Sequence, residues 1–406
     1  MSPASETGSL LAAPAATAVF TTVLTEGPVS RVGLARRLGL SSAAVTKAAR
    51  PLIELGYLHE LAATERSGPG AGRPASPLAV RAEREFFVGV KITADELIGV
   101  VCDLCARVRA TARRRLRAPD RRTPATPSAT AGRAADSDVE AVLAEVGRLV
   151  DGLLDTLPEH RARIRRLGLS LSGDVDHTTG LVRYSPFLHW RDVPLGERVA
   201  RLTGLAVTVE NDVKALTAAE HWFGEGVGAE SFALVTVGTG IGCGLVVNGR
   251  LVSGAYGVAG EIGHLVVDAT GPDCHCGGRG CVESIAGTDA IVAQARHRTG
   301  QPDLTLDEAV ALARGGHEEL RAVFTRAGDA IGCGIAAVAN LVGPTRIVVS
   351  GEGLAAYDLF DTPIRTSFER QAFGAAARCP VTIRPLPFEE WARGAAAVSI
   401  QSLVLP

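Results

Sequence analysis

Residues 260–287 read GEIGHLVVDATGPDCHCGGRGCVESIAG, and this stretch holds three cysteines within eight positions, at Cys274, Cys276 and Cys281. Glycines stand between them, and glycine lets the backbone turn tightly enough to fold round an ion. In a chain without a secretion signal, clustered cysteines indicate a metal site before a disulfide. The spacing therefore predicts three thiolate ligands on one zinc ion.

A tetrahedral zinc site needs a fourth ligand, and histidine commonly completes a set of three cysteines. The sequence offers His264 and His275. We expect His264, because His275 lies between two of the cysteines, where reaching the same ion would strain the loop. Such a closed site is structural, since it leaves no open position for water. The expected cofactor is thus a structural Zn²⁺, and the alternative is a set of reduced buried thiols.

The length of 406 residues allows two or three domains. A content of 46% hydrophobic and 21% charged residues indicates a soluble globular protein and excludes a disordered or fibrous chain. No stretch reaches the roughly 18 uninterrupted apolar residues of a membrane helix. The N-terminus also lacks the basic region of a signal peptide. We therefore expect a cytoplasmic protein with no membrane partner.

The N-terminal segment shows repeated helix signals after a leader over residues 1–14 that we expect to be disordered. Helical spacing of apolar residues covers Ala15–Leu24. Ser30 can cap a second helix over Arg31–Leu38, and Ser41 can cap a third that runs to about Leu55. The core positions that this spacing selects include Val32, Leu34, Val45 and Leu52.

Two extended pieces follow the helices, around Tyr57–Ala62 and Ala75–Val80, and the segment between them includes SGPGAGRP, which has hairpin-tip composition. Residues 27–80 carry seven basic and three acidic side chains, 7 − 3 = +4, which suits phosphate binding. Three helices, a hairpin and a basic balance predict a winged helix-turn-helix domain over residues 15–80. The alternative is a three-helix packing module with no DNA partner.

The third helix supplies the residues expected to contact DNA. Its N-terminal end would read base edges, while longer cations bind phosphate and an arginine on the wing enters the minor groove. The expected DNA-binding residues are Ser41, Ser42, Ala43, Thr46, Lys47, Arg50 and Arg73.

From Glu85 onward, strands alternate with helices, which indicates an α/β architecture. The Pro-, Thr-, Ala- and Arg-rich segment Ala118–Asp136 is expected to be a mobile loop. We expect a first α/β lobe over residues 85–204, completed by a C-terminal helix over 391–406. A second lobe over residues 205–390 would carry the zinc site.

Three motifs resemble those of the ROK family (repressors, open reading frames, kinases). They are the zinc-bearing stretch 260–287, Val209-Glu210-Asn211-Asp212 before a helix, and GTGIGCGLVVNGRL at 238–251. The resemblance extends from about Ala13 to the C-terminus. It implies two α/β lobes of actin-like, ribonuclease H-like sugar kinase fold with a sugar cleft between them. It also implies that the N-terminal winged helix-turn-helix is the one carried by the regulators of the family.

The resemblance also assigns site residues. Asn211 and Asp212 match the pair that contacts the sugar, and the Asp is the catalytic base in kinases. Glu261 and His264 match the sugar-binding residues of the GEIGH element, and Glu283 matches the sugar-binding Glu after the last zinc cysteine. The histidine is expected to hold the zinc as well. Carboxylates and carboxamides suit sugar hydroxyls, and a zinc knot would hold its neighbours rigidly.

Departures from the kinase pattern count against catalysis. Where kinases have an Asp-x-Gly-Gly-Thr phosphate loop, this chain reads VGVKITAD at residues 88–95. The second glycine loop is intact at Gly238, Thr239, Gly240 and Gly242. That loop could face a nucleotide or be an inherited hairpin with a structural role.

These observations predict a sugar-responsive, DNA-binding regulator of the repressor type, with Asp212 as a vestigial base. Its partners would be double-stranded operator DNA and a sugar or sugar phosphate effector, in a homodimer or tetramer. The alternatives are an ATP-dependent sugar kinase that uses Asp212 as base, and a zinc-stapled scaffold whose pocket is vestigial.

Overall fold

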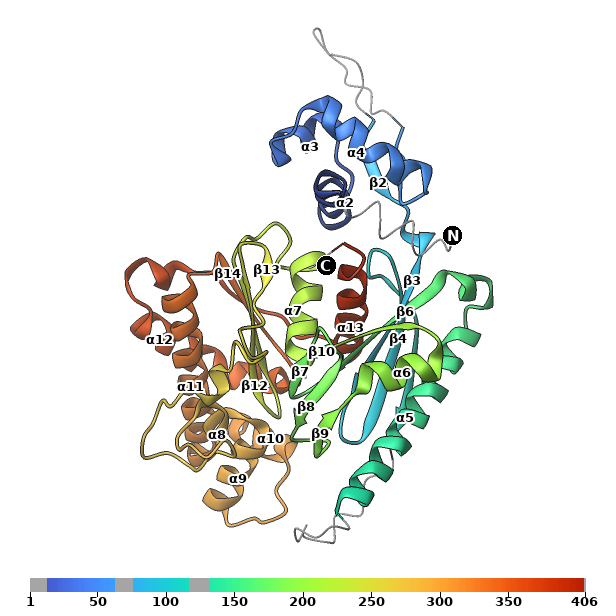
Figure 1. Ribbon diagram of the computed structural model, residues 1–406. Helices are drawn as coiled ribbons and strands as arrows, with labels where there is room; N and C mark the ends of the chain where they lie inside the picture. The colour runs from blue at the N-terminus through green and yellow to red at the C-terminus, as the bar shows by residue number, and fades with distance from the viewer. Residues whose placement is uncertain (1–12, 63–75, 117–130, 405–406) are drawn as a thin grey trace. The chain divides into compact units, whose positions relative to one another are not determined.

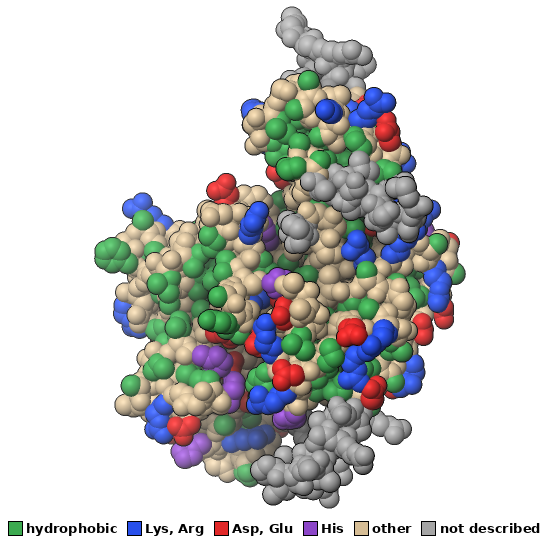
Figure 2. All heavy atoms as spheres, in the orientation of Figure 1, with side chains coloured by type: hydrophobic (Ala, Val, Ile, Leu, Met, Phe, Trp, Pro, Cys, Tyr) green, Lys and Arg blue, Asp and Glu red, His purple; other side chains and the backbone are tan. Residues whose placement is uncertain are grey.

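The computed structural model describes residues 13–62, 76–116 and 131–404 (Figure 1). The chain divides into two compact units. The first contains the chain up to Gly228 and the C-terminal segment from Glu389, and the second is Ala229–Phe388. On the visible face, basic side chains are interspersed with acidic ones over both units (Figure 2).

The N-terminal segment of the first unit consists of three helices and a pair of antiparallel strands. They are α2 (Pro14–Glu26), α3 (Arg31–Leu38), α4 (Ser42–Glu54), β1 (Leu58–Glu60) and β2 (Leu78–Val80). Both predicted caps are confirmed, because the Ser30 side chain accepts from the Gly33 amide and the Ser41 side chain from the Ala44 amide. Gly39 has φ +63°, the left-handed conformation that ends α3.

The core of this segment includes Leu34, Val45 and Leu52, as predicted. Val32 was expected there as well, but its side chain is 70% exposed. Residues two apart on a helix point in nearly opposite directions. Because Leu34 faces the core, Val32 cannot. The predicted leader and the wing tip with Arg73 lie largely or wholly outside the described residues.

The main sheet of the first unit has the strand order β10-β6-β3-β4-β5. Its strands are β3 (Phe86–Ile92), β4 (Glu96–Asp103), β5 (Val108–Arg115), β6 (Ile164–Leu171) and β10 (Ala206–Asn211). β10 and β3 run parallel to β6, while β4 and β5 are antiparallel to their neighbours. Because β10 belongs to this sheet, the boundary after residue 204 that we predicted from the sequence is displaced to residue 228.

Helices and short segments surround this sheet. They are η1 (Ala82–Arg84), α5 (Ala131–Asp155), η2 (Pro158–Arg163), α6 (Leu195–Thr203), α7 (Asp212–Phe223) and α13 (Glu389–Gln401). A small sheet joins β7 (Asp174–Asp176), β8 (Leu181–Ser185) and β9 (Trp190–Val193). The predicted mobile loop is wrong over residues 131–136, which are helical. Alanine, the best helix former, is frequent in that part of the sequence.

The C-terminal helix α13 packs directly on the sheet and on α7. A Cβ at Gly89 would lie 2.1 Å from the Ala392 carbonyl oxygen, and one at Gly168 would lie 1.8 Å from that of Ala395. Two glycines on adjacent strands therefore allow the helix backbone to contact β3 and β6.

The second unit has its own sheet, with the order β13-β12-β11-β14-β15. Its strands are β11 (Phe232–Val237), β12 (Ile241–Val247), β13 (Arg250–Leu251), β14 (Arg346–Ser350) and β15 (Val381–Ile383). Its helical segments are η3 (Ile262–His264), α8 (Val282–Ala286), α9 (Thr288–Thr299), α10 (Leu306–Arg314), α11 (Glu318–Val342), η4 (Glu352–Ala356), α12 (Tyr357–Gln371) and η5 (Gly374–Arg378).

Among the described residues, α11 is the one helix long and apolar enough to cross a membrane by length and composition. In its most apolar 18-residue window, 67% of the residues are buried inside the structure. Leu320, Phe324 and Ile335 of this helix have no exposed surface, and α11 packs on α8, α9 and α12. It is the central core helix of the second unit.

Candidate functional site

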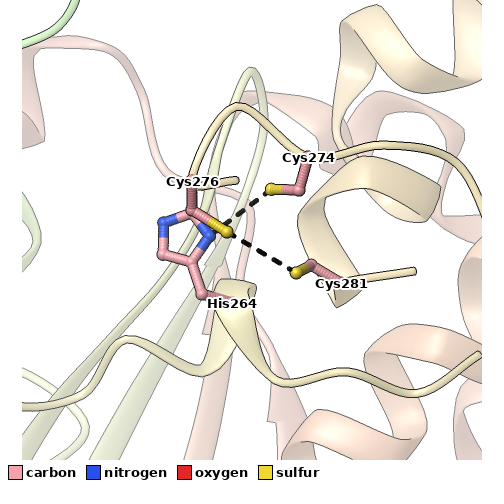
Figure 3. A group of neighbouring side chains, drawn as sticks. All are labelled: His264, Cys274, Cys276 and Cys281. Atoms are coloured by element: carbon pink, nitrogen blue, oxygen red, sulfur yellow. Dashed lines mark hydrogen bonds between the residues drawn. The ribbon is translucent and has the colours of Figure 1, made fainter. Parts of the chain in front are cut away.

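The predicted metal ligands lie together in the second unit. The ligand atoms of His264, Cys274, Cys276 and Cys281 all lie within 4.8 Å of one another, so these four side chains could hold a metal ion. Figure 3 shows them pointing toward a common centre from η3, the cysteine loop and the start of α8. The Nδ1 of His264 is 3.7 Å from the Cys274 sulfur, and the sulfurs of Cys276 and Cys281 are 3.8 Å apart.

These separations fit a tetrahedral ion. With zinc–sulfur bonds of about 2.3 Å, two sulfur ligands stand about 3.8 Å apart. The choice between the two histidines is also decided here. His275 points its Nδ1 at Glu283, 3.3 Å from Oε1, and its ring packs edge-on against that of His264 at 5.2 Å. His264, and not His275, belongs to the group with the three cysteines.

The thiols differ in their readiness to ionise. Burial raises the pKa of Cys274 and raises that of Cys281 to about 12, whereas the Gly278 N–H, 3.4 Å from the Cys276 sulfur, lowers the pKa of Cys276. A cation would offset the cost of ionising the two buried thiols, and its binding would release their protons.

The backbone around the cysteines is closely packed. Gly280 has φ +66°, and a Cβ there would lie 1.5 Å from the Asp268 carbonyl oxygen. The Asp268 side chain pairs with Arg326 of α11 at 2.7 Å. The loop is thus anchored to the core helix, and α8 begins immediately after Cys281.

Glu283, a predicted sugar ligand, lies in the first turn of α8. Its Oε2 accepts from the Ile241 amide at 2.9 Å, and a Cβ at Gly240 would lie 2.8 Å from the same oxygen. The carboxylate therefore contacts the turn between β11 and β12, which contains most of the predicted nucleotide loop.

A second carboxylate contacts the other side of this turn. The Thr239 amide donates to Oε1 of Glu352 at 3.1 Å, and a Cβ at Gly238 would lie 2.0 Å from that oxygen. Gly242 is already part of β12, where it pairs with Thr236. Sequence reasoning missed Glu352, because it follows β14 and nothing in its own surroundings indicates a contact with the loop.

Glu261, the remaining predicted sugar ligand of this unit, is exposed and directly precedes η3. The glycines that flank it are sterically required. A Cβ at Gly260 would lie 2.0 Å from the Cys243 carbonyl oxygen, and one at Gly263 would lie 2.3 Å from that of Ile241. The GEIGH element is thus fitted against β12.

The first unit holds the other two predicted sugar ligands. Asn211 ends β10 and caps α7, its Oδ1 accepting from the amides of Val213 and Lys214 and its Nδ2 donating to the Gly173 carbonyl. Asp212 is the first residue of α7 and is buried. Both are therefore held in place by the junction of strand and helix.

Asp212 forms a buried ion pair that the sequence did not predict. Its Oδ2 accepts from the Lys91 ammonium, and each side chain is only 7% exposed. The same oxygen accepts from the Ser172 hydroxyl at 2.6 Å. Burial alone would raise the pKa of Asp212, but the charge and hydrogen bond of Lys91, aided by Ser172, hold it below its ordinary value. The available signal was composition, since Lys91 is one of only three lysines in the sequence.

The predicted DNA-contacting residues within the described range lie on one face of α4 or at its cap. Ser41, Ser42, Ala43, Thr46, Lys47 and Arg50 are all exposed. All except Ser41 line a surface hollow, together with Pro51 and Glu54. Arg50 is not a free cation, because its Nε donates to Glu54 at 2.8 Å. The opposite face of α4 is buried through Val45, Ala48, Ala49 and Leu52.

Comparison with known proteins gives three kinds of match. The model of the ROK family matches residues 132–401. The DNA-binding transcriptional repressor Mlc of Escherichia coli strain K12 is 29% identical over 375 residues, which cover 88% of this chain and 86% of that protein.

Two solved structures complete the comparison. A ROK family transcriptional regulator, titled a homolog of E. coli Mlc, has a TM-score of 0.77 at 26% identity and covers 96% of each chain. A ROK family glucokinase from Streptomyces griseus, solved with glucose and AMPPNP, has a TM-score of 0.59 at 27% identity. It covers 78% of this chain and 99% of its own.

Proposed function

Because this chain belongs to the ROK family, we propose that it is a sugar-responsive, DNA-binding transcriptional regulator of the repressor type and not a sugar kinase. The observation that carries the proposal is the difference in coverage. The solved regulator matches 96% of this chain, whereas the solved glucokinase matches 78% although almost all of the glucokinase is aligned. The chain therefore has residues beyond those that align with the glucokinase, and we propose that α2 to β2 is that additional segment.

The N-terminal segment supports DNA binding through its α3–turn–α4 arrangement and its paired strands. We propose that it is a winged helix-turn-helix, with α4 as the helix that enters the major groove. Ser42, Ala43 and Thr46 would face bases, and Lys47 would contact phosphate. Arg50 would reach phosphate only by leaving Glu54. Arg73 remains a wing contact proposed from the sequence alone.

Kinase activity is disfavoured by the state of Asp212. A general base must accept a proton from the sugar hydroxyl. One oxygen of Asp212 already accepts from Lys91 and Ser172, and the other accepts from the Val213 amide. The Lys91 ammonium stabilises the carboxylate and so weakens it as a base. Asp212 is then suited to bind a sugar hydroxyl and not to deprotonate it.

We propose that Asn211 and Asp212 are sugar ligands of the first unit. For the second unit we propose that Glu261, His264 and Glu283 bind sugar hydroxyls. The metal would be zinc, held by His264, Cys274, Cys276 and Cys281. Four protein ligands leave no open position, so the ion would stiffen the loop that carries Glu283 and take no part in chemistry. Binding of sugar would change DNA affinity through a coupling of about 1–3 kcal/mol. Such a regulator would act in the cytoplasm, as a homodimer or tetramer.

The test is a gel-shift titration of the full chain on DNA fragments from beside its own gene, with and without a panel of hexoses and pentoses. We expect a specific complex that a sugar weakens or strengthens. Lys47→Ala should lower affinity uniformly across sequences and reduce the salt slope by about 1. Arg161→Ala, which removes an exposed cation from the body of the first unit, is the matched control.

Two results would contradict the proposal. One is the absence of any complex at moderate salt. The other is equal loss of binding in the Lys47 and Arg161 variants, which would make the interaction a general effect of charge. Sugar-dependent turnover of ATP that Asp212→Asn abolishes would favour the kinase instead.

A further inference from the structure

The turn Gly238–Ile241 presents two backbone amides to anions, and both are already bonded to carboxylates of this chain. Thr239 donates to Glu352 and Ile241 donates to Glu283, at 3.1 and 2.9 Å. Backbone amides of a glycine-rich turn can bind an anion such as phosphate. Here the anions that they bind belong to the protein.

The glycines of the turn allow this close approach. A side chain at Gly238 would collide with Glu352, and one at Gly240 would collide with Glu283. From the sequence, the loop could serve a nucleotide or be a structural hairpin. The contacts favour a third possibility, in which the two amides that could receive a phosphate are bonded to carboxylates of the chain itself. A phosphate at this position would have to displace Glu352 or lie against its negative charge.

The first unit provides an independent observation of the same kind. Lys91 lies on β3, in the segment that stands where kinases have a phosphate loop. Its ammonium is a group that would attract a phosphate, but it is buried and paired with Asp212. A phosphate that approached Lys91 would lie beside a carboxylate with little water to screen the repulsion.

We infer that this chain excludes phosphoryl groups from its ligands, so that its effector is an uncharged sugar and neither a sugar phosphate nor a nucleotide. This inference rests on the proposed function for the existence of a sugar effector. The exclusion itself depends only on Glu352 in the second unit and on the Lys91–Asp212 pair in the first.

The first experiment opens the turn. Thermal unfolding of the wild type, Glu352→Gly, Glu352→Gln and Glu369→Gln is measured with inorganic phosphate and with ATP. Glu369 is an exposed acid on α12 of the same unit, so its variant controls for the loss of one negative charge. We expect no phosphate-dependent shift in the wild type or in Glu369→Gln. Glu352→Gly should bind phosphate about tenfold more tightly, as expected when a charge-assisted hydrogen bond is gained.

Glu352→Gln keeps the size of the side chain and removes its charge, so it carries the same test if Glu352→Gly fails to fold. The inference is overturned if ATP or phosphate stabilises the wild type as strongly as the Glu352 variants. It is also overturned if no Glu352 variant gains affinity.

The second experiment compares each sugar with its own phosphate ester on the wild type, by calorimetry and by the gel shift. We expect an uncharged sugar to bind at least about tenfold more tightly than its ester, because burying the ester's charge without a partner is unfavourable. An ester that binds more tightly than its sugar, in a chain that still binds DNA, overturns this inference and leaves the proposed function intact. If the chain does not bind DNA but still excludes phosphate, the proposed function is overturned and the exclusion of phosphate stands.

Discussion

The resemblance to the kinases of the family points to two short segments, one in each unit, as the counterparts of phosphate contacts. In the first unit the end of β3 has a changed sequence, and a lysine there pairs with the buried acid that would be the catalytic base. In the second unit the glycine turn is intact in sequence, but Glu352 and Glu283 bond to its amides. The first segment departs from the kinase pattern in sequence, whereas the second has the expected glycines and bonds to carboxylates of the chain itself.

The difference teaches that an intact sequence motif is, by itself, weak support for an intact ligand site. The departure of the first segment from the kinase pattern can be read in eight consecutive residues, 88–95. Occupation of the turn in the second unit depends on a residue 113 positions away. Three variants test whether the two segments also differ in their contribution to the free energy of unfolding.

The largest effect is expected from the metal site, because it holds the loop that leads to Glu283 and thereby one side of the turn. Cys276→Ser removes one thiol from an exposed position, so it creates no cavity. We expect loss of one equivalent of bound zinc by elemental analysis. If the ion contributes several kcal/mol, the thermal midpoint falls by about 10 °C.

Cys333→Ser is the control for the metal experiment, since Cys333 lies outside the group of four ligands. It should keep the zinc and the midpoint. Full metal content in the Cys276 variant would show that the Cys276 thiol is not a ligand of the ion.

The next effect concerns the Lys91–Asp212 pair. Lys91→Met leaves a buried carboxylate uncompensated, which costs about 3–5 kcal/mol. Because Asp212 has a lowered pKa in the folded wild type, its ionised carboxylate stabilises the fold at neutral pH. This stabilisation is lost as the pH falls through that pKa. In the variant Asp212 can protonate more readily, so the difference from wild type should shrink toward acid pH.

Urea unfolding of Lys91→Met at neutral and acid pH measures this effect, and the double variant Lys91→Met/Asp212→Asn is the control. Removing both charges should recover most of the lost stability. If the free energy of unfolding of Lys91→Met lies within about 1 kcal/mol of that of the wild type at neutral pH, the first segment contributes no more to stability than the second.

The smallest effect is expected at the turn itself. Gly238→Ala would push against Glu352 Oε1, but Glu352 is exposed and can swing away. We expect a loss of about 1 kcal/mol or less in urea unfolding, the scale of one surface hydrogen bond. A loss as large as that of Lys91→Met would show that the contact of Glu352 with the turn contributes as much stability as the Lys91–Asp212 pair.

The sequence was most informative where neighbours along the chain determine the structure. Ser30 and Ser41 cap helices within three residues, and the predicted metal ligands Cys274, Cys276 and Cys281 lie in one loop with His264 nearby. Local spacing predicts such features because the partners are fixed by backbone geometry over a few residues.

Contacts between distant residues were beyond such reasoning. Lys91 meets Asp212 across 121 positions, and the boundary after residue 204 failed because the partner of β10 is β6, which only the sheet reveals. The prediction that Val32 is buried was wrong for a different reason. Apolar character does not determine which way a side chain points on a short helix. The fold class could be predicted from the sequence, whereas the charge balance of the site could not.

The position of α13 has a consequence for protein synthesis. The ribosome makes β3 and β6 early, yet the helix that covers Gly89 and Gly168 follows the whole second unit in the sequence. Any nascent chain that stops before Glu389 leaves those strands uncovered on that face, whatever the state of the intervening unit. Chains that lack α13 would therefore expose apolar sheet to aggregation and degradation.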